Sequence, residues 1–318
     1  MKILKVSVCL LFVFSLFVFV NPVSAQKKVN LTIAAGPLGG AFHPISAGIA
    51  AIVNAKAEGL SVNVQMTGGG VENTRLLGRG RADIGLVGAD QAYYAIHKQQ
   101  MFKNDTLKLE TLGALYPTVY QYIALKKSGI KTIDDLKGKK VAIGEPGGGS
   151  EMSFNILLRA TKWTKDDIKP VYLPYGQAVE QLADGLIDAA IVAAGVPTAA
   201  ITSLAMNQDV VLLTMPDRIW VEYQKLNPFA LMEDFPAGLY RGYNVPSKMI
   251  VLKILLGSRQ DLDQDVAYKI VKALYSNLDQ MVTYHAAAKF IRAETAPKTS
   301  IPLNKGAEKF FREAGFMK

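Results

Sequence analysis

Four glycine-rich turns are the segments of this sequence best suited to hold a ligand through the backbone. They span residues 35–42, 66–73, 88–91 and 145–150, three of them with glycine runs, and each lies between an apolar strand pattern and a helical pattern. Glycine lets a ligand approach the backbone closely, and the helix that follows presents free N–H groups and the positive end of its dipole. The turns could therefore bind an anion, most simply a carboxylate, with main-chain donors alone.

Each turn also has a purely structural interpretation. Asp90 and Ser150 could be only N-caps, and residues 68–70 could be only a tight turn. Nucleotide motifs do not fit, because residues 144–151 lack the lysine of a phosphate-binding P-loop and the other turns lack the dinucleotide glycine spacing. A small organic anion is thus a better candidate than a nucleotide.

Signs of catalysis or of a resident metal are few. The three histidines are scattered along the chain and show no paired metal spacing: His43, His97 and His285. No histidine lies close in sequence to Ser150, and the single cysteine, Cys9, excludes a disulfide framework and a cysteine-based zinc site. We therefore expect no enzyme, no cofactor and no metal site.

Two charged clusters have open roles. Glu145 and Glu151 flank a glycine run and could act as a general acid and base, but carboxylates at a helix start also complement the helix dipole. Arg75, Arg79 and Arg81 could form a solvated helix face, or a salt bridge to a ligand or a membrane partner. The sequence favours the structural interpretation for both clusters.

The helices and strands that position these turns can be predicted from the length of the chain and the periodicity of its apolar residues. The chain has 318 residues, half of them apolar, which suits two domains of about 150 residues. Short apolar runs alternate with helical patterns, so we predict an α/β protein. Two separate strands are expected at residues 111–115 and 121–126, and one long helix at residues 264–284.

A weak internal repeat supports two similarly built lobes. Leu77-x-x-Gly80-x-x-Asp83-x-x-x-Val87 recurs 105 residues later as Leu182-x-x-Gly185-x-x-Asp188-x-x-x-Val192. Each copy has the pattern of a helix that ends at a glycine, followed by an aspartate that leads into a buried strand.

The N-terminus has the pattern of a cleaved secretory signal peptide, residues 1–25. Lys2 and Lys5 precede the mostly apolar residues 6–20 and the small-residue site Val23-Ser-Ala25. Cleavage would lower the net charge from +9 to +7 and remove the only cysteine. Export to the periplasm is the expectation.

Basic residues show no dense run beyond residues 137–140. Binding of nucleic acid or of a membrane surface is therefore the least favoured of the functions considered.

Several ordered motifs together resemble the TAXI family, the extracytoplasmic solute receptors of a class of TRAP transporters. The motifs are Gly-Pro-x-Gly-Gly-x-Phe-x-Pro (36–44), Thr-Gly-Gly-Gly-Val-Glu-Asn (67–73), Ala-Asp-Ile-Gly-Leu-Val (82–87), Ala-Leu-Tyr-Pro (114–117) and Gly-Glu-Pro-Gly-Gly-Gly-Ser (144–150). The resemblance implies a type II periplasmic-binding-protein fold, with two α/β lobes and a ligand cleft between them. Residues 26–115 and 243–318 are expected to form lobe 1, and residues 116–242 lobe 2.

The resemblance also implies a function and a site. The ligand would be glutamate or a related dicarboxylate such as 2-oxoglutarate, and the partner a sodium-driven TRAP permease that receives ligand from a monomeric receptor. The residues placed around the cleft are Gly39, Gly40, Ala41, Phe42, Thr67, Asn73, Asp90, Gln91, Tyr116, Gly149, Ser150, Gly195, Pro197 and Tyr240.

One departure and one alternative qualify this expectation. Relatives typically carry Thr-Tyr-Tyr where this chain has Ala41-Phe42-His43, so the hydroxyls of those side chains are missing and the ligand could be less polar than glutamate. The alternative function is an exported enzyme or a sensor ligand-binding protein on the same bilobal fold.

Overall fold

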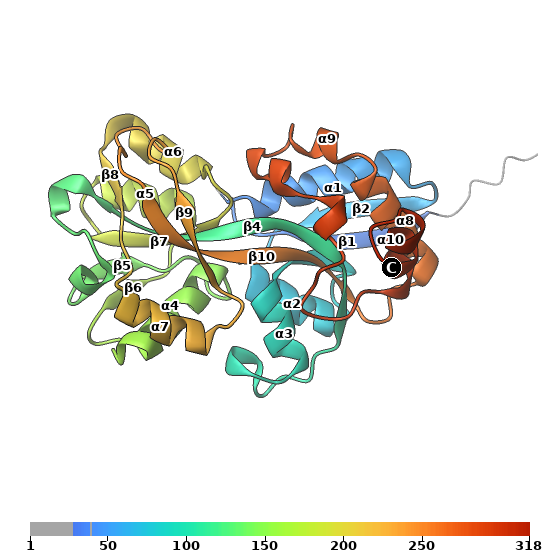
Figure 1. Ribbon diagram of the computed structural model, residues 1–318, viewed down its shortest axis with the longest axis horizontal. Coiled ribbons are helices and arrows are strands. Elements are labelled where there is room, and N and C mark those ends of the chain that lie inside the picture. The colour runs from blue at the N-terminus through green and yellow to red at the C-terminus, as the bar shows by residue number, and fades with distance from the viewer. Residues whose placement is uncertain (1–27, 39) are drawn as a thin grey trace, which may run out of the picture.

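The computed structural model describes residues 28–38 and 40–318 (Figure 1). The predicted signal peptide and Gly39 lie outside the described residues. Within these ranges, no helix combines the length and the apolar character that a membrane crossing requires.

The first lobe is an α/β unit with three parallel strands. Strand β1 pairs with both β2 and β3. The elements are β1 (Val29–Ala34), α1 (Phe42–Lys56), β2 (Leu60–Gln65), α2 (Gly70–Gly78), β3 (Ile84–Gly88) and α3 (Ala89–Ile96), with α8 (Gln264–Tyr275), α9 (Leu278–Met281) and α10 (Lys305–Glu313) from the end of the chain. Figure 1 shows these three late helices on the same side of the molecule as α1.

The second lobe repeats this plan. Strand β5 pairs in parallel with β6 and β7. The elements are β5 (Lys140–Ala142), α4 (Gly149–Thr161), β6 (Lys169–Val171), α5 (Tyr175–Ala183), β7 (Ala189–Ala194), α6 (Ala199–Asn207), β8 (Val210–Leu212), α7 (Asp217–Leu226) and β9 (Leu231–Phe235). Short 3₁₀ helices complete the described chain at Gln100–Phe102, Lys126–Ser128, Ile133–Leu136, Ala286–Phe290 and Ala293–Thr295.

The internal repeat has a physical basis in both lobes. Asp83 bridges to Thr32 on β1: its Oδ2 accepts from the Thr32 N–H at 2.8 Å, and its own N–H donates to the Thr32 carbonyl at 3.1 Å. Asp188 makes the same pair of bonds with Lys140, both at 2.8 Å. The glycine of each copy has a positive φ, 65° and 72°, which only glycine adopts readily. Each aspartate therefore fixes one strand beside its parallel neighbour.

Two long antiparallel strands join the lobes. Strands β4 (Leu109–Leu125) and β10 (Ser247–Arg259) pair along most of their length, and Figure 1 shows them running through the middle from one lobe to the other. The sheet order is β2-β1-β3-β10-β4-β7-β5-β6, with β8 on β4 and β9 on β10. All ten strands of the described residues thus form one mixed sheet.

The prediction of separate strands at residues 111–115 and 121–126 was wrong. Pro117 was the apparent break, but it lies within β4 opposite Lys253, next to a register shift between Lys253 and Leu255. A proline is tolerated at such a bulge because the missing N–H removes no regular ladder bond there.

The prediction of one helix over residues 264–284 was also wrong. Helix α8 ends at Tyr275, and the short α9 begins at Leu278. The Asn277 side chain donates to the Ala273 carbonyl at 2.8 Å, as asparagine often does where a helix ends. The apolar stripe continues through this break, so periodicity alone did not show it.

Candidate functional site

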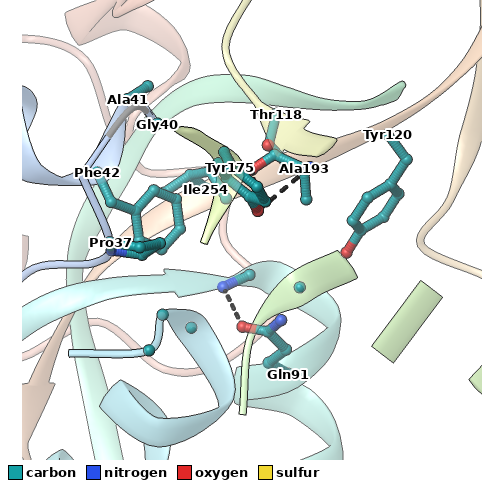
Figure 2. Close-up of a pocket in the computed structure, with 15 residues that line it drawn as sticks. Pro37, Gly40, Ala41, Phe42, Gln91, Thr118, Tyr120, Tyr175, Ala193 and Ile254 are labelled. Carbon is teal, nitrogen blue, oxygen red and sulfur yellow. Dashed lines mark hydrogen bonds between the residues drawn. The ribbon is translucent and has the colours of Figure 1, made fainter. Parts of the chain in front are cut away.

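A cavity lies where the N-termini of five helices meet. Helices α1, α2 and α3 reach it from the first lobe and α4 and α5 from the second, together with residues of β4, β7 and β10 (Figure 2). The space between these elements is about 470 Å³, a volume that includes room open to solvent. The lining residues are Pro37, Gly40, Ala41, Phe42, Gly68, Gly69, Gly70, Gly88, Gln91, Thr118, Tyr120, Gly149, Tyr175, Ala193 and Ile254.

Polar groups in the cavity wall could orient a ligand. The Thr118 hydroxyl is buried and has no hydrogen-bond partner among the described residues. The Gln91 Oε1 accepts from the Gly88 N–H at 2.9 Å, which fixes the amide and leaves its NH₂ group available. Figure 2 shows the Tyr120 hydroxyl on the side of the cavity that faces Gln91.

Apolar residues lie among these polar groups in the cavity wall, since Ile254 pairs with Gly88 and Ala193 with Tyr120. Pro37 and Phe42 come from the first glycine turn and the start of α1, Ile254 from β10 and Ala193 from β7 (Figure 2). No lysine, arginine or histidine belongs to the lining set that the described residues provide. An anion would therefore have to be held by N–H groups, an amide and hydroxyls, helped by the five helix dipoles.

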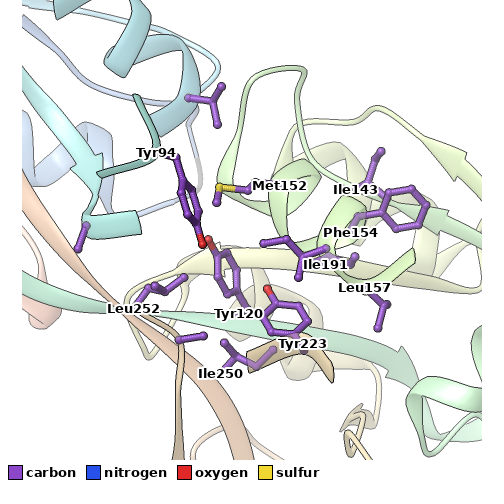
Figure 3. Close-up of a cluster of buried hydrophobic side chains, with 14 of the residues drawn as sticks. Tyr94, Tyr120, Ile143, Met152, Phe154, Leu157, Ile191, Tyr223, Ile250 and Leu252 are labelled. Atoms are coloured by element: carbon purple, nitrogen blue, oxygen red, sulfur yellow. The ribbon is translucent and has the colours of Figure 1, made fainter. Parts of the chain in front are cut away.

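A buried carboxyl group lies directly behind the cavity wall. Asp90 is fully buried, and its oxygens accept from the Gln91 N–H and the Asn227 side chain, both at 2.8 Å. Burial raises the pKa of Asp90 to about 6. Figure 3 shows Tyr94, Tyr120 and Tyr223 clustered from α3, β4 and α7, and the nearby Asp90 carboxylate contributes to raising the pKa of each hydroxyl.

Stability should depend on the protonation of Asp90. Its pKa is higher in the folded chain, about 6, than the ordinary value of 3.8, so the folded state gains stability as the pH falls through 6 and loses it as the pH rises. The difference corresponds to stability on the order of 3 kcal/mol. In urea unfolding, Asp90→Asn should be more stable than wild type at pH 8, and this advantage should shrink at pH 5. An advantage that is independent of pH would contradict this assignment.

The two lobes touch at the rim of the cavity. The Gly147 carbonyl of the second lobe accepts from the Val71 and Glu72 N–H groups at the start of α2, at 3.0 and 3.1 Å. A Cβ atom at Gly68 would lie 2.5 Å from the Pro146 carbonyl oxygen. This contact closes the cleft over the cavity and depends on glycine at position 68.

The structure brings part of the predicted site to the cavity. The predicted residues that line it are Gly40, Ala41, Phe42, Gln91 and Gly149. Gly39 lies outside the described residues. The ligand-binding roles of all these residues stay predictions.

Asn73 and Thr67 point into the first lobe and do not line the cavity. The Asn73 amide donates to the carbonyls of Ala34, Ala35 and Leu86 at 3.3, 2.6 and 2.7 Å, and its Oδ1 accepts from the Thr67 hydroxyl at 2.7 Å. Both side chains are buried. They hold the second glycine turn against β1 and β3.

Ser150 supports the cavity from behind. Its hydroxyl accepts from the Ala193 N–H at 3.0 Å and contacts the Tyr175 hydroxyl at 3.1 Å. Since Tyr175 and Ala193 both line the cavity, Ser150 positions two lining residues without lining it.

Of the remaining predicted residues, Tyr116, Gly195 and Tyr240 are buried and Pro197 is exposed, and none lines the cavity. The Tyr240 hydroxyl accepts from the Thr198 N–H at 3.0 Å and donates to Gln121. The Tyr116 hydroxyl is buried without a partner among the described residues. Gly195 packs tightly, since a Cβ there would lie 2.5 Å from Ala287. The residues that do not line the cavity are Thr67, Asn73, Asp90, Tyr116, Ser150, Gly195, Pro197 and Tyr240.

Glu151, Arg75 and Arg79 of the charged clusters have structural partners. Glu151 accepts from the Gly147 N–H at 2.8 Å and from the Tyr172 hydroxyl at 2.6 Å, as a carboxylate at a helix start would. Arg75 and Arg79 pair with Asp105 at 3.1 and 2.7 Å. Among the described residues, no group of three or more histidine, cysteine, aspartate or glutamate side chains could hold a metal.

Sequence reasoning missed Thr118, Tyr120 and Tyr175. Tyr175 begins α5, and the repeat offset of 105 places it opposite Gly70, which begins α2, so the repeat could have identified it. Thr118 and Tyr120 lie within a strand, where no turn motif marks them.

Comparison with known families shows what this chain is related to. A family model described as the NMT1-like family matches residues 33–315, which include every cavity-lining residue. The chain belongs to the NMT1-like family. This match does not identify the TAXI family specifically, which stays a prediction.

Solved structures show that this NMT1-like chain shares the periplasmic-binding-protein fold. It is similar to the periplasmic binding protein BugD, with 15% identity and a TM-score of 0.55 over 92% of this chain and 99% of that one. It is also similar to MatC from Rhodopseudomonas palustris with bound malate, with 15% identity and a TM-score of 0.55 over 90% and 97%. A putative L-cystine ABC transporter protein from Listeria monocytogenes shares 14% identity, with a TM-score of 0.50 over 85% and 99%. The predicted fold class is confirmed.

Proposed function

We propose that this protein is an extracytoplasmic solute receptor that captures a small organic anion for a membrane transporter of the TRAP class. The observation that carries the proposal is the convergence of five helix N-termini, from both lobes, on one cavity lined by neutral donors. The names of the fold relatives agree with it, since one is a periplasmic binding protein and another was solved with bound malate.

The finer proposal is that the receptor is of the TAXI type. It rests on the ordered sequence motifs, and several of them form the turns that line the cavity. Glutamate and 2-oxoglutarate are the ligands that the resemblance suggests. A sodium-driven permease would be the partner, and the receptor would act in the periplasm as a monomer after cleavage at residue 25.

The lobe boundaries belong to the same proposal. Residues 26–115 with 243–318 would move as one lobe, and residues 116–242 as the other. Strands β4 and β10 pass between the lobes, so the hinge would lie where each strand crosses. Opening would break the bonds from Gly147 to Val71 and Glu72.

A thermal-shift screen of organic acids tests the proposed function. A ligand that binds only the folded state raises the melting temperature in a concentration-dependent way, and at 100 times its Kd it adds about 2.7 kcal/mol of stability. We expect such a shift with at least one carboxylate, and no chemical conversion of that compound. Turnover of a substrate, together with no shift by any organic acid, would favour the alternative of an exported enzyme.

A further inference from the structure

We propose that the cavity selects organic acids of one net negative charge and rejects dianions. This inference rests on the proposed function and narrows its substrate class. It bears on the two ligands that the TAXI resemblance suggests: both carry two carboxylates, but only glutamate also carries an ammonium group, which brings its net charge at neutral pH to minus one against minus two for 2-oxoglutarate.

The first observation is the sign of the charges around the cavity. Asp90 is fully buried, and a Cβ at the lining residue Gly88 would lie 2.6 Å from its Oδ1. Glu145 adjoins the fourth glycine turn, and its Oε2 is buried without a partner among the described residues. Glu72 accepts from the N–H of the lining residue Gly68 at 2.7 Å. Three carboxyl groups therefore lie behind the turns that a ligand would contact.

The second observation is that no basic side chain among the lining residues that the structure describes offsets these carboxyl groups. Burial and the neighbouring Glu72 raise the pKa of Glu145, with no arginine or lysine contributing. In a site of low effective dielectric, a second ligand carboxylate would meet these like charges with little screening.

The third observation is the apolar part of the cavity wall. A first carboxylate can lie at the N-terminus of α4, where Gly149 lines the cavity, because the Val71 and Glu72 N–H groups of α2 already donate to the Gly147 carbonyl. The lining also includes Phe42 and Ile254, which offer no hydrogen bond to a second carboxylate. The free-energy cost of removing water from the second carboxylate would therefore not be offset by hydrogen bonds to these side chains.

Matched pairs of acids test this inference by calorimetry at pH 7.5. The pairs are pentanoate with glutarate, and 2-oxopentanoate with 2-oxoglutarate, which differ only by the second carboxylate. We expect the monoanion of at least one pair to bind at least tenfold more tightly than its dianion. Equal or tighter binding of the dianions would overturn the inference and leave the receptor function standing. Failure of every organic acid to bind would overturn the proposed function as well.

Variants of the buried carboxyl groups test the cause. Asp90→Asn and Glu145→Gln remove charge with little change of shape, so each should reduce the monoanion preference several-fold. Asp217→Asn, at an exposed position at the start of α7, is the matched control and should leave the preference unchanged. A preference that stays the same in Asp90→Asn and Glu145→Gln, while both variants still bind, would overturn the role of these charges.

Discussion

Replacing Gly68 by alanine should weaken ligand binding about a hundredfold, equivalent to about 2.7 kcal/mol. The added Cβ would lie 2.5 Å from the Pro146 carbonyl oxygen, closer than real side-chain carbons come to backbone atoms. Pro146 belongs to the second lobe, so the clash would hold the lobes apart. The Gly147 bonds to the start of α2 would then be lost with the closed cleft.

Gly176→Ala is the matched control for this prediction. Gly176 lies in α5 next to a lining residue, but its added Cβ would meet no atom within 4 Å. Titration calorimetry of the wild type and both variants should show a loss of affinity only for Gly68→Ala. A Kd within twofold of wild type for Gly68→Ala would mean that the closed contact is not needed for binding.

Replacing Asn73 by alanine should lower the free energy of unfolding by about 3 kcal/mol. The Asn73 amide is the donor to three buried carbonyls, those of Ala34, Ala35 and Leu86, and its oxygen accepts from the Thr67 hydroxyl. Its loss leaves several buried groups without partners, and each such group costs about 1–3 kcal/mol before the structure relaxes.

Urea unfolding measures this effect against two other variants. Asn207→Ala, at the exposed end of α6, should change stability little. Thr67→Val removes the bond to Asn73 and the bond that the Thr67 hydroxyl accepts from the Gly69 N–H, and it should cost less than Asn73→Ala. Wild-type stability in Asn73→Ala, together with lost ligand binding, would show instead that Asn73 contacts the ligand as the sequence predicted.

The glycine turns could be located from the sequence because their chemistry is local. A glycine run between a strand pattern and a helix pattern requires only neighbouring residues to be recognised, and all four turns contribute to the cavity. The direction of a side chain within a turn is not local. Asn73 lies in the first turn of α2, yet it points back to β1 and β3 because those strands present carbonyls that need a donor.

The strand residues of the site could not be predicted in the same way. Thr118 and Tyr120 face the cavity because side chains alternate along β4, and Val119 between them is buried on the other side. That alternation was hidden by Pro117, which suggested a break in the strand. Only the pairing with β10 shows that the strand continues through it.

The internal repeat predicted which positions of the two lobes are equivalent, which no individual motif does. Asp83 and Asp188 occupy equivalent places because each bridges to the first strand of its lobe. The same equivalence relates Gly70 to Tyr175, although these residues share no chemistry. The two lobes therefore keep a common scaffold while each supplies different side chains to the cavity.

A crystal structure of the protein with a bound organic acid tests the central claim most directly. We expect a ligand carboxylate within hydrogen-bond distance of N–H groups at the N-terminus of α1, α2 or α4, inside the cavity between the lobes. A carboxylate held instead by lysine or arginine side chains, or a ligand bound outside this cavity, would contradict the account.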